Sequence, residues 1–140
     1  MSIIHQVSEN IFLQGAVIKL LISPAYTNQD IANLSTTHSV SLQALIDTGA
    51  RTTLIATESI EQMGLVPSGM SIISTATHQN IECLVYDLDL IFPNGHKISP
   101  IQIIAVPLKD ENIHCLIGRD ILSLALFEYN GKENSFTLSF

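Results

Sequence analysis

The residues with the clearest chemical potential are Asp47, Thr48 and Gly49, which directly follow the apolar pair Leu45 and Ile46. An acid at the end of a buried strand is costly to desolvate, so it needs a donor, a partner of opposite charge or a catalytic role. Gly49 permits a sharp turn and the close approach of another chain or a substrate. Thr48 can donate a hydrogen bond within its own loop or to a second copy of that loop. The triplet therefore indicates a carboxylate held at a turn, where it could act as a general acid or base.

Two further segments have recognisable patterns. Residues 115–122 read Cys-Leu-Ile-Gly-Arg-Asp-Ile-Leu, an apolar run that a glycine breaks before a short helix. Residues 136–140 read Phe-Thr-Leu-Ser-Phe and alternate as a strand does. Residues 45–50, Leu-Ile-Asp-Thr-Gly-Ala, resemble the active-site loop of retroviral-type aspartic proteases, the retropepsins. The other two segments resemble that family's second signature and its terminal strand, in the family's order.

The resemblance implies a fold and an assembly. We expect a mostly β chain, with a single domain over residues 1–140 that forms a closed β-barrel with a flap hairpin and one or two short helices. An aspartic protease needs two carboxylates that share a proton, one acting on water as a base and the other on the scissile carbonyl as an acid. The chain has one Asp-Thr-Gly, and its second signature reads Ile-Gly-Arg-Asp instead. Two Asp47 side chains are therefore expected to meet on the axis of a homodimer.

The resemblance also implies roles for the neighbours of the catalytic residue, Asp47. Thr48 would form a hydrogen bond across the two-fold axis and hold the two loops together. Gly49 would offer backbone groups to the substrate and the carboxylates, and Ala50 would line the pocket beside the scissile bond. Gly118 would leave room for its strand to pass beneath the Asp47 loop.

The second signature consists of Ile117, Gly118, Arg119 and Asp120, and its arginine departs from the viral pattern. Viral enzymes pair that arginine with an acid two residues after the glycine of the active-site triplet, and this position is Arg51 here. Arg119 therefore needs another partner, and the candidate carboxylates are those of Glu58, Glu61 and Asp120. An additional hairpin over residues 127–140 is more similar to cellular and bacterial retropepsin-like proteins than to compact viral enzymes.

Apolar and β-branched runs predict the strands that position these residues. The expected strands cover residues 11–22, 40–46, 70–76, 81–92, 98–106, 113–117, 127–129 and 135–140. Helices are expected over residues 57–64 and 119–126. Residues 27–39 are polar and are expected to form a surface loop or, alternatively, a loop that binds a partner. Alternation along residues 86–92 predicts that Asp87 and Asp89 both face water.

A β-hairpin is expected after the first helix, because two of these strands flank a short polar turn at residues 77–80. In the family, the hairpin at this place is the flap over the substrate. Its tip would consist of Ala76, Thr77, His78, Gln79 and Asn80. This tip lacks the glycines of the viral flap, and an ordinary surface hairpin is the alternative interpretation.

The composition limits the classes of partner. The chain has 140 residues, 46% of them hydrophobic, which suffices for one domain with a core. A net charge of −7 with only 6 Lys and Arg argues against binding to nucleic acid and to an anionic membrane surface. We recognise neither an apolar run long enough to span a bilayer nor a signal peptide.

The cysteines bear on the compartment and on metals. Cys83 and Cys115 lie in apolar segments and are expected to be buried free thiols of a cytoplasmic protein, with a disulfide between them as the alternative. His114 lies beside Cys115, but no second cluster of potential ligands exists in the sequence. We therefore expect no metal and no other cofactor.

Three functions fit these patterns. The leading one is an aspartic endopeptidase that cleaves peptide or protein substrates at apolar subsites. A non-catalytic dimerisation or peptide-binding module of the same fold is the first alternative, with Asp47 as a buried structural acid. A small β-barrel that binds a small molecule, with an accidental Asp-Thr-Gly, is the second. The presence of both Asp47 and Thr48 favours the enzyme, because a scaffold needs neither.

The last strand raises a separate question about assembly. Phe136, Leu138 and Phe140 share one face of this strand, and three large apolar groups on one face need a cover. The partner subunit or the chain's own core would supply that cover. Strand alternation fits both interpretations equally.

Overall fold

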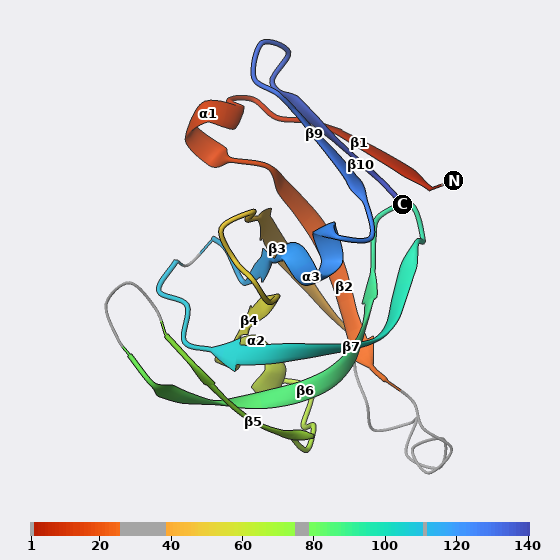
Figure 1. The fold of residues 1–140 in the computed structure, drawn as a ribbon. Helices are drawn as coiled ribbons and strands as arrows, with labels where there is room; N and C mark the ends of the chain where they lie inside the picture. The colour runs from red at the N-terminus through yellow and green to blue at the C-terminus, as the bar shows by residue number, and fades with distance from the viewer. Residues whose placement is uncertain (1, 26–38, 75–78, 111) are drawn as a thin grey trace.

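The computed structural model describes residues 2–25, 39–74, 79–110 and 112–140 (Figure 1). These residues form three short helices, α1 (Ile11–Gln14), α2 (Thr57–Glu61) and α3 (Arg119–Leu122). Their strands are β1 (Ile3–Val7), β2 (Val17–Pro24), β3 (Val40–Ile46), β4 (Leu54–Ala56), β5 (Gly69–Ile73), β6 (Ile81–Ile91), β7 (Lys97–Val106), β8 (Cys115–Ile117), β9 (Leu126–Asn130) and β10 (Ser135–Ser139).

Six strands close into a barrel in the order β2-β3-β8-β4-β7-β6, and a further pairing of β6 with β2 completes the ring. β6 is long enough to pair with two different strands along the same edge. Its second half pairs with β2, and its first half pairs with β5, from Ile73 opposite Ile81 to Gly69 opposite Val85. The hairpin of β5 and β6 therefore extends beyond the ring (Figure 1). The closed β-barrel predicted from the sequence is confirmed.

Alternating apolar side chains fill the barrel. Ile18, Leu20 and Ile22 of β2 are buried, as are Leu42 and Ala44 of β3, while the residues between them in each strand are largely exposed. This period of two is what a strand with one face on a core requires. Each fully buried leucine or isoleucine contributes about 1.5–3 kcal/mol to the stability of the folded state.

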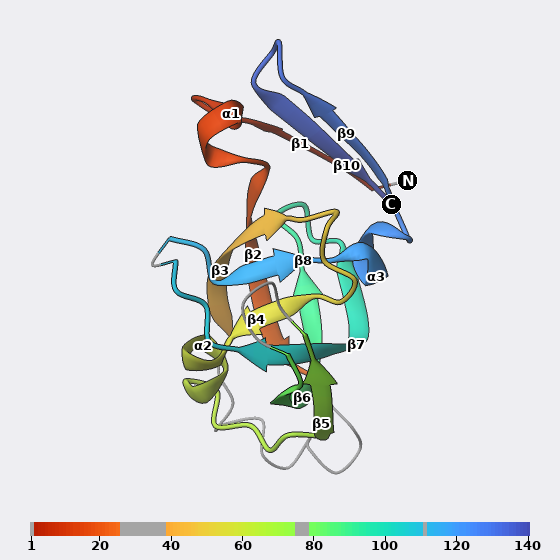
Figure 2. The same ribbon diagram turned by 60° about the vertical axis from the view of Figure 1, so that its left-hand side comes forward.

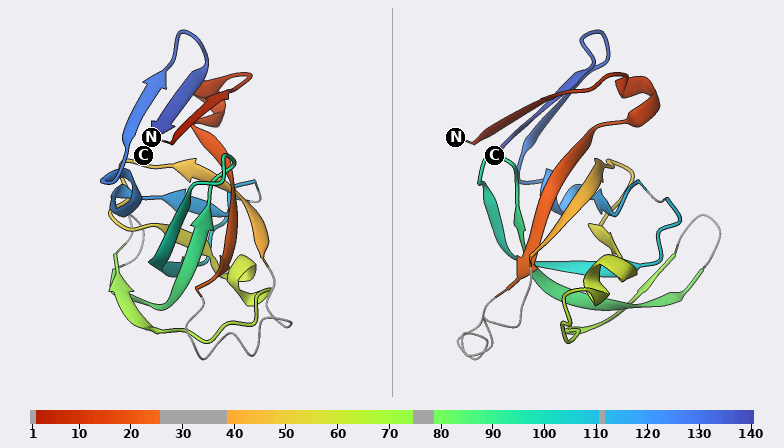
Figure 3. Two further views of the ribbon diagram at one scale, coloured as in Figure 1. Left: turned by 90° about the vertical axis from the view of Figure 1, so that its right-hand side faces the viewer. Right: turned by 180° about the vertical axis from the view of Figure 1, so that it is seen from behind.

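A second, three-stranded sheet lies against one end of the barrel, with the order β1-β10-β9 and antiparallel pairing throughout. Figure 3 shows this sheet above the barrel, with both ends of the chain at it. Phe136 and Leu138 are buried in the core of their own chain. Phe140 is half-buried and stacks on His96, with ring centroids 4.2 Å apart. The apolar face of β10 is therefore covered by the chain itself.

The strand predicted over residues 11–22 is wrong at its beginning, where the chain forms α1 and only then β2. The Asn10 side chain accepts a hydrogen bond from the Leu13 N–H at 3.2 Å and caps this helix. Gly15 ends the helix with a φ of 75°, a conformation that suits glycine. The helix cap and the positive-φ glycine thus favour a helix here, although the apolar and β-branched composition favours a strand.

The helices predicted over residues 57–64 and 119–126 are both shorter than expected, because α2 ends at Glu61 and α3 ends at Leu122. After α2 the chain turns, and Gly64 adopts a φ of 64°. After α3 it enters β9 at Leu126, so the apolar residues there serve a strand.

Asp87 is exposed as predicted, whereas the prediction for Asp89 is wrong: Asp89 is 3% exposed. The pairing of β6 with β7 is irregular between Leu88 and Leu90, and such a bulge disturbs the alternation of inward and outward side chains. Asp89 is stabilised by the Ser99 hydroxyl, which donates to its carboxylate, and by the Lys97 ammonium at 3.2 Å. A buried carboxylate needs partners of this kind.

Within the described ranges, no helix is both long and apolar enough to cross a membrane. Cys83 and Cys115 are buried and not joined to each other. No group of three His, Cys, Asp or Glu side chains suited to holding a metal ion occurs in the described part of the chain.

Candidate active site

Asp47 lies at the end of β3, where the barrel positions it through main-chain hydrogen bonds. Its N–H donates to the Ile117 carbonyl of the parallel neighbour β8 at 2.9 Å. Its carboxylate oxygen Oδ1 accepts from the Gly49 N–H at 2.8 Å, and its carbonyl accepts from the Ala50 N–H at 3.1 Å. The side chain is half-buried, so the carboxylate is held by its own turn at the protein surface.

The turn after Asp47 is tight and leaves little room for a side chain at Gly49. A Cβ at Gly49 would lie 3.0 Å from Asp47 Oδ1, closer than a side chain there would allow without a shift. Thr48 is exposed at the tip of the loop, and Ala50 is half-buried behind it. The loop therefore presents a carboxylate and a threonine side by side at the surface.

The second signature supports this loop from the side (Figure 2). The Arg119 N–H donates to the Ala50 carbonyl at 2.8 Å, and the Arg119 guanidinium donates to the Thr48 carbonyl at 2.8 Å. No carboxylate among the described residues lies within ion-pair distance of Arg119. The expectation that Glu58, Glu61 or Asp120 pairs with Arg119 is wrong, because a main-chain carbonyl takes the place of the acid.

Asp120 instead holds Thr53, a residue that the sequence analysis did not single out. The Thr53 N–H and hydroxyl donate to the two oxygens of the Asp120 carboxylate at 3.0 and 2.7 Å. Thr53 Oγ1 in turn accepts from the Gly118 N–H at 3.1 Å. Thr53 is fully buried, and these bonds satisfy its hydroxyl. A buried threonine has no distinctive sequence pattern, so only the fold reveals this link.

Gly118 lies directly against the end of the Asp47 loop. A Cβ there would lie 2.7 Å from the Thr52 carbonyl carbon and 2.9 Å from the Thr53 nitrogen. Both contacts are with backbone, which cannot move aside as a flexible side chain can. Ile117, which precedes Gly118, is buried, and its carbonyl accepts the hydrogen bond from the Asp47 N–H.

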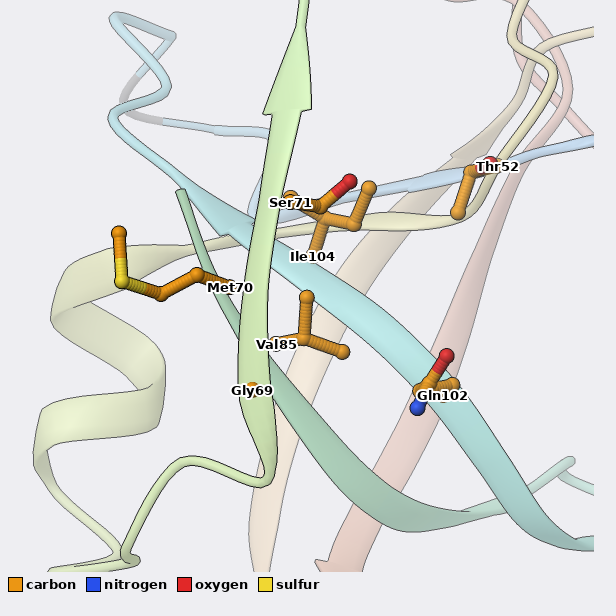
Figure 4. Close-up of a pocket in the computed structure, with 7 residues that line it drawn as sticks. All are labelled: Thr52, Gly69, Met70, Ser71, Val85, Gln102 and Ile104. Atoms are coloured by element: carbon orange, nitrogen blue, oxygen red, sulfur yellow. The ribbon is translucent and has the colours of Figure 1, made fainter. Parts of the chain in front are cut away.

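A cleft of about 620 Å³ separates the Asp47 loop from the β5–β6 hairpin. Its lining comes from the loop, from β4, from the β5 strand with the residue after it, and from β7; the residues are Gly49, Ala50, Arg51, Thr52, Leu54, Ser71, Ile72, Ile73, Ser74 and Ile104. A neighbouring cavity of about 270 Å³ shares Thr52, Ser71 and Ile104 with this cleft (Figure 4). The cleft thus runs between the loop that holds the acid and one strand of the hairpin.

The hairpin predicted as a flap exists, since β5 and β6 pair antiparallel. Of its predicted tip, Gln79 and Asn80 are exposed, and Asn80 adopts a φ of 56°. Ala76, Thr77 and His78 lie outside the described residues.

Cys115, on the strand that pairs with β3, is not suited to act as a nucleophile. Cys115 is fully buried in β8, and burial, with a smaller effect from the charge of Asp120, raises the pKa of its thiol well above the usual range. A buried thiol of this kind stays protonated, and the thiolate is the reactive form. Asp47 is therefore the better placed group for chemistry at the cleft.

Comparisons with known proteins identify a matching family and a matching fold. The family model described as "Aspartyl protease" matches residues 34–121, more than half of the chain, from ahead of the Asp47 loop to Ile121. A retropepsin-like aspartic protease from Rickettsia conorii is 14% identical, covers 99% of this chain and 93% of its own, and superposes with a TM-score of 0.60. At this identity the likeness shows the fold.

Two further solved structures superpose less closely on the chain. The retroviral protease-like domain of Ddi1 from Leishmania major is 15% identical over 88% of each chain, with a TM-score of 0.48. The foamy viral protease-reverse transcriptase is 18% identical over 77% of this chain, with a TM-score of 0.49, and this chain spans only 12% of its length. No curated protein sequence matches the chain. By its family match the chain belongs to the aspartyl protease family, and its fold is retropepsin-like.

Proposed function

We propose that the chain, as a single domain over residues 1–140, is an aspartic endopeptidase that works as a homodimer, with one Asp47 from each subunit. The observation that carries this proposal is the exposed side of the Asp47 loop. The loop holds one carboxylate by its own turn and borders a cleft of about 620 Å³ between the loop and the β5–β6 hairpin. One carboxylate cannot act as acid and base in the same step, so a second must come from another copy.

The chemistry requires the two carboxylates to share one proton, because two like charges in contact cannot both ionise. The charged Asp47 accepts a proton from water, which attacks the scissile carbonyl. The protonated Asp47 donates its proton to the carbonyl oxygen, which gives a tetrahedral diol. Thr48 would bind the facing loop across the axis, Gly49 would offer its backbone to the substrate, and Ala50 would border the scissile bond.

The remaining predicted residues act around this centre. Arg119 fixes the Asp47 loop through the Thr48 carbonyl, and Gly118 allows its backbone to lie close to the loop. The β5–β6 hairpin, with its tip at residues 76–80, would close over a bound peptide and exclude water. The free, buried thiols of Cys83 and Cys115 support a cytoplasmic location for the enzyme.

The test is cleavage of a peptide library at acid and neutral pH. Asp47→Asn should keep the fold and abolish cleavage, because an amide cannot share the proton. Asp87→Asn makes the same change at an exposed position of β6 and should cleave as the wild type does. A statine-type inhibitor, which mimics the diol, should block the wild type.

Wild-type rates in Asp47→Asn would remove Asp47 from the mechanism. Peptide binding without cleavage by the wild type would support the non-catalytic module instead.

A further inference from the structure

The chain has only two arginines, Arg51 and Arg119, and both lie at the Asp47 loop. Arg51 is exposed and lines the cleft, where the other nine lining residues among those described are uncharged. In a chain with a net charge of −7, a cation at this place is conspicuous. Arg51 therefore gives the apolar and hydroxyl-lined cleft a positive charge.

The Arg51 guanidinium has no acidic partner in the described part of the chain. No carboxylate there lies within 4.0 Å of it, whereas Lys97 is paired with Asp89 at 3.2 Å. Asp120 is close in the fold, since its N–H donates to the Arg51 carbonyl at 3.2 Å. Its carboxylate, however, accepts from Thr53 and from the Ile121 N–H at 2.8 Å.

The other arginine is not equivalent. The Arg119 guanidinium donates to the Thr48 carbonyl and so serves the loop itself. The main chain of Arg51 is fixed by the Asp120 N–H, while its side chain is exposed at the cleft and forms no ion pair with another residue that the structure describes. A guanidinium is a planar donor that matches a carboxylate in two parallel hydrogen bonds.

We propose that Arg51 is a specificity-determining residue that selects substrates with a glutamate or aspartate near the scissile bond, beside apolar residues. This inference rests on the proposed function, because it places the substrate in the cleft next to Asp47. The apolar partners are Leu54, Ile72 and Ile104 of the same cleft. In the homodimer, the two-fold axis adds a second Arg51, so an acidic residue on either side of the bond is accepted.

The effect should be moderate, because an exposed ion pair is weakened by water and salt. We expect the wild type to favour a glutamate peptide over its glutamine counterpart about fivefold in kcat/KM. Glutamine has nearly the same shape as glutamate, so the ratio isolates the charge.

The experiment measures this ratio at about pH 6 with peptides that carry glutamate or glutamine at each position around the cleavage site. Arg51→Gln should bring the ratio to about one, and Arg51→Glu should reverse it, since the charge of the cleft is reversed. Arg51→Lys should keep part of the preference. Lys132→Gln removes one positive charge from the exposed β9–β10 turn and should keep the wild-type ratio. Thermal unfolding checks that each variant is folded.

The wild type alone supplies a second readout. Its preference should fall towards one as the pH drops below about 4.3, where the glutamate of the peptide becomes neutral. A ratio that is insensitive to both pH and Arg51→Gln would overturn the proposal.

Binding to the Asp47→Asn variant separates this inference from the proposed function. Fluorescent glutamate and glutamine peptides should bind this variant with the same preference, and Arg51→Gln in the same background should remove it. If the wild type cleaves no peptide but the binding preference depends on Arg51, catalysis fails and the inference stands. Equal binding of both peptides overturns the inference whether or not the wild type is active.

Discussion

Gly118 and Thr53 determine the position of the Asp47 loop, although neither reaches the cleft surface. Gly118 lies against the backbone of Thr52 and Thr53, and its N–H donates to the Thr53 hydroxyl. The Thr53 hydroxyl donates in turn to Asp120, in the first turn of α3. The end of the Asp47 loop is thus connected to the second signature by contacts that tolerate little change.

Gly118→Ala should destabilise the protein by about 1–3 kcal/mol, because the new Cβ meets backbone atoms that must shift. Its peptide cleavage should also fall by more than the loss of folded protein explains, since the shifted backbone belongs to the Asp47 loop. Gly69→Ala is the matched control, because a Cβ at Gly69 meets nothing within 4 Å. Urea unfolding and peptide cleavage measure both effects, and equal stabilities of the two variants would contradict the close packing at Gly118.

Cys115 predicts a dependence of stability on alkaline pH. Burial raises the pKa of this thiol in the folded state, so the folded chain keeps its proton where the unfolded chain releases it. The stabilisation is fully present below the ordinary thiol pKa of about 8.5 and is lost above it, by about 1.4 kcal/mol per pH unit. Cys115→Ala should be less stable at neutral pH but should show a shallower alkaline decline in urea unfolding. Equal slopes would contradict this prediction.

At the scale of residues, the sequence indicated the loop and Gly118 but not the hydrogen bonds that hold them in place. Asp47, Gly49 and Gly118 are recognisable because a carboxylate and two glycines in apolar runs are unusual. The bond from Thr53 to Asp120 joins residues 67 positions apart, and the sequence does not reveal which buried hydroxyl meets which acid. The partner of Arg119 was missed for a related reason, since any main-chain carbonyl can replace a carboxylate.

At the scale of elements, the neighbours of β10 show whether its apolar face packs within the chain or against a partner. It is the central strand of its sheet, with β1 on one edge and β9 on the other. Its side chains Phe136 and Leu138 reach the core that the barrel also uses. The sequence predicted the alternation of β10. It did not predict whether the chain's own core or a partner subunit packs on the apolar face, because a period of two fits both a core and an interface.

Leu138→Ala should destabilise the chain by about 2–5 kcal/mol, because the side chain is fully buried and leaves a cavity. Leu126→Ala, on the neighbouring strand β9, changes a residue that is 61% exposed and should cost about 0.5 kcal/mol or less. Urea unfolding at a protein concentration that keeps the chain monomeric makes the comparison. Similar losses for the two variants would contradict the internal role of β10.

Two errors at this scale have local causes. α1 was missed because a helix of one turn depends on its cap and its final glycine more than on composition. The inward orientation of Asp89 was missed because a bulge changes the alternation without leaving a clear mark in the sequence. The long strands β3, β6 and β7 were predicted well, since their apolar patterns persist over many residues.

At the scale of the whole molecule, the proposed mechanism makes activity depend on assembly. Specific activity should fall on dilution, because each active site needs two chains and the dimer dissociates. Analytical ultracentrifugation at the same concentrations should show the monomer appearing where activity is lost. Two copies joined by a flexible linker are the control and should resist dilution, since the second copy stays at a high effective concentration. Specific activity that persists in a solution of monomers would contradict a site shared between chains.

Because β10 is the central strand of its sheet, each chain should be able to fold before it assembles with a second copy. A strand that already has its own neighbours on both edges needs none from a partner, so each chain can complete its sheet alone. The newly synthesised protomer should therefore be a folded and inactive monomer rather than an unfolded chain that folds only on dimerisation. Under the proposed mechanism, the cell would set the onset of proteolysis by how much of the protein it makes, because abundance relative to the dimer dissociation constant decides how many sites are complete.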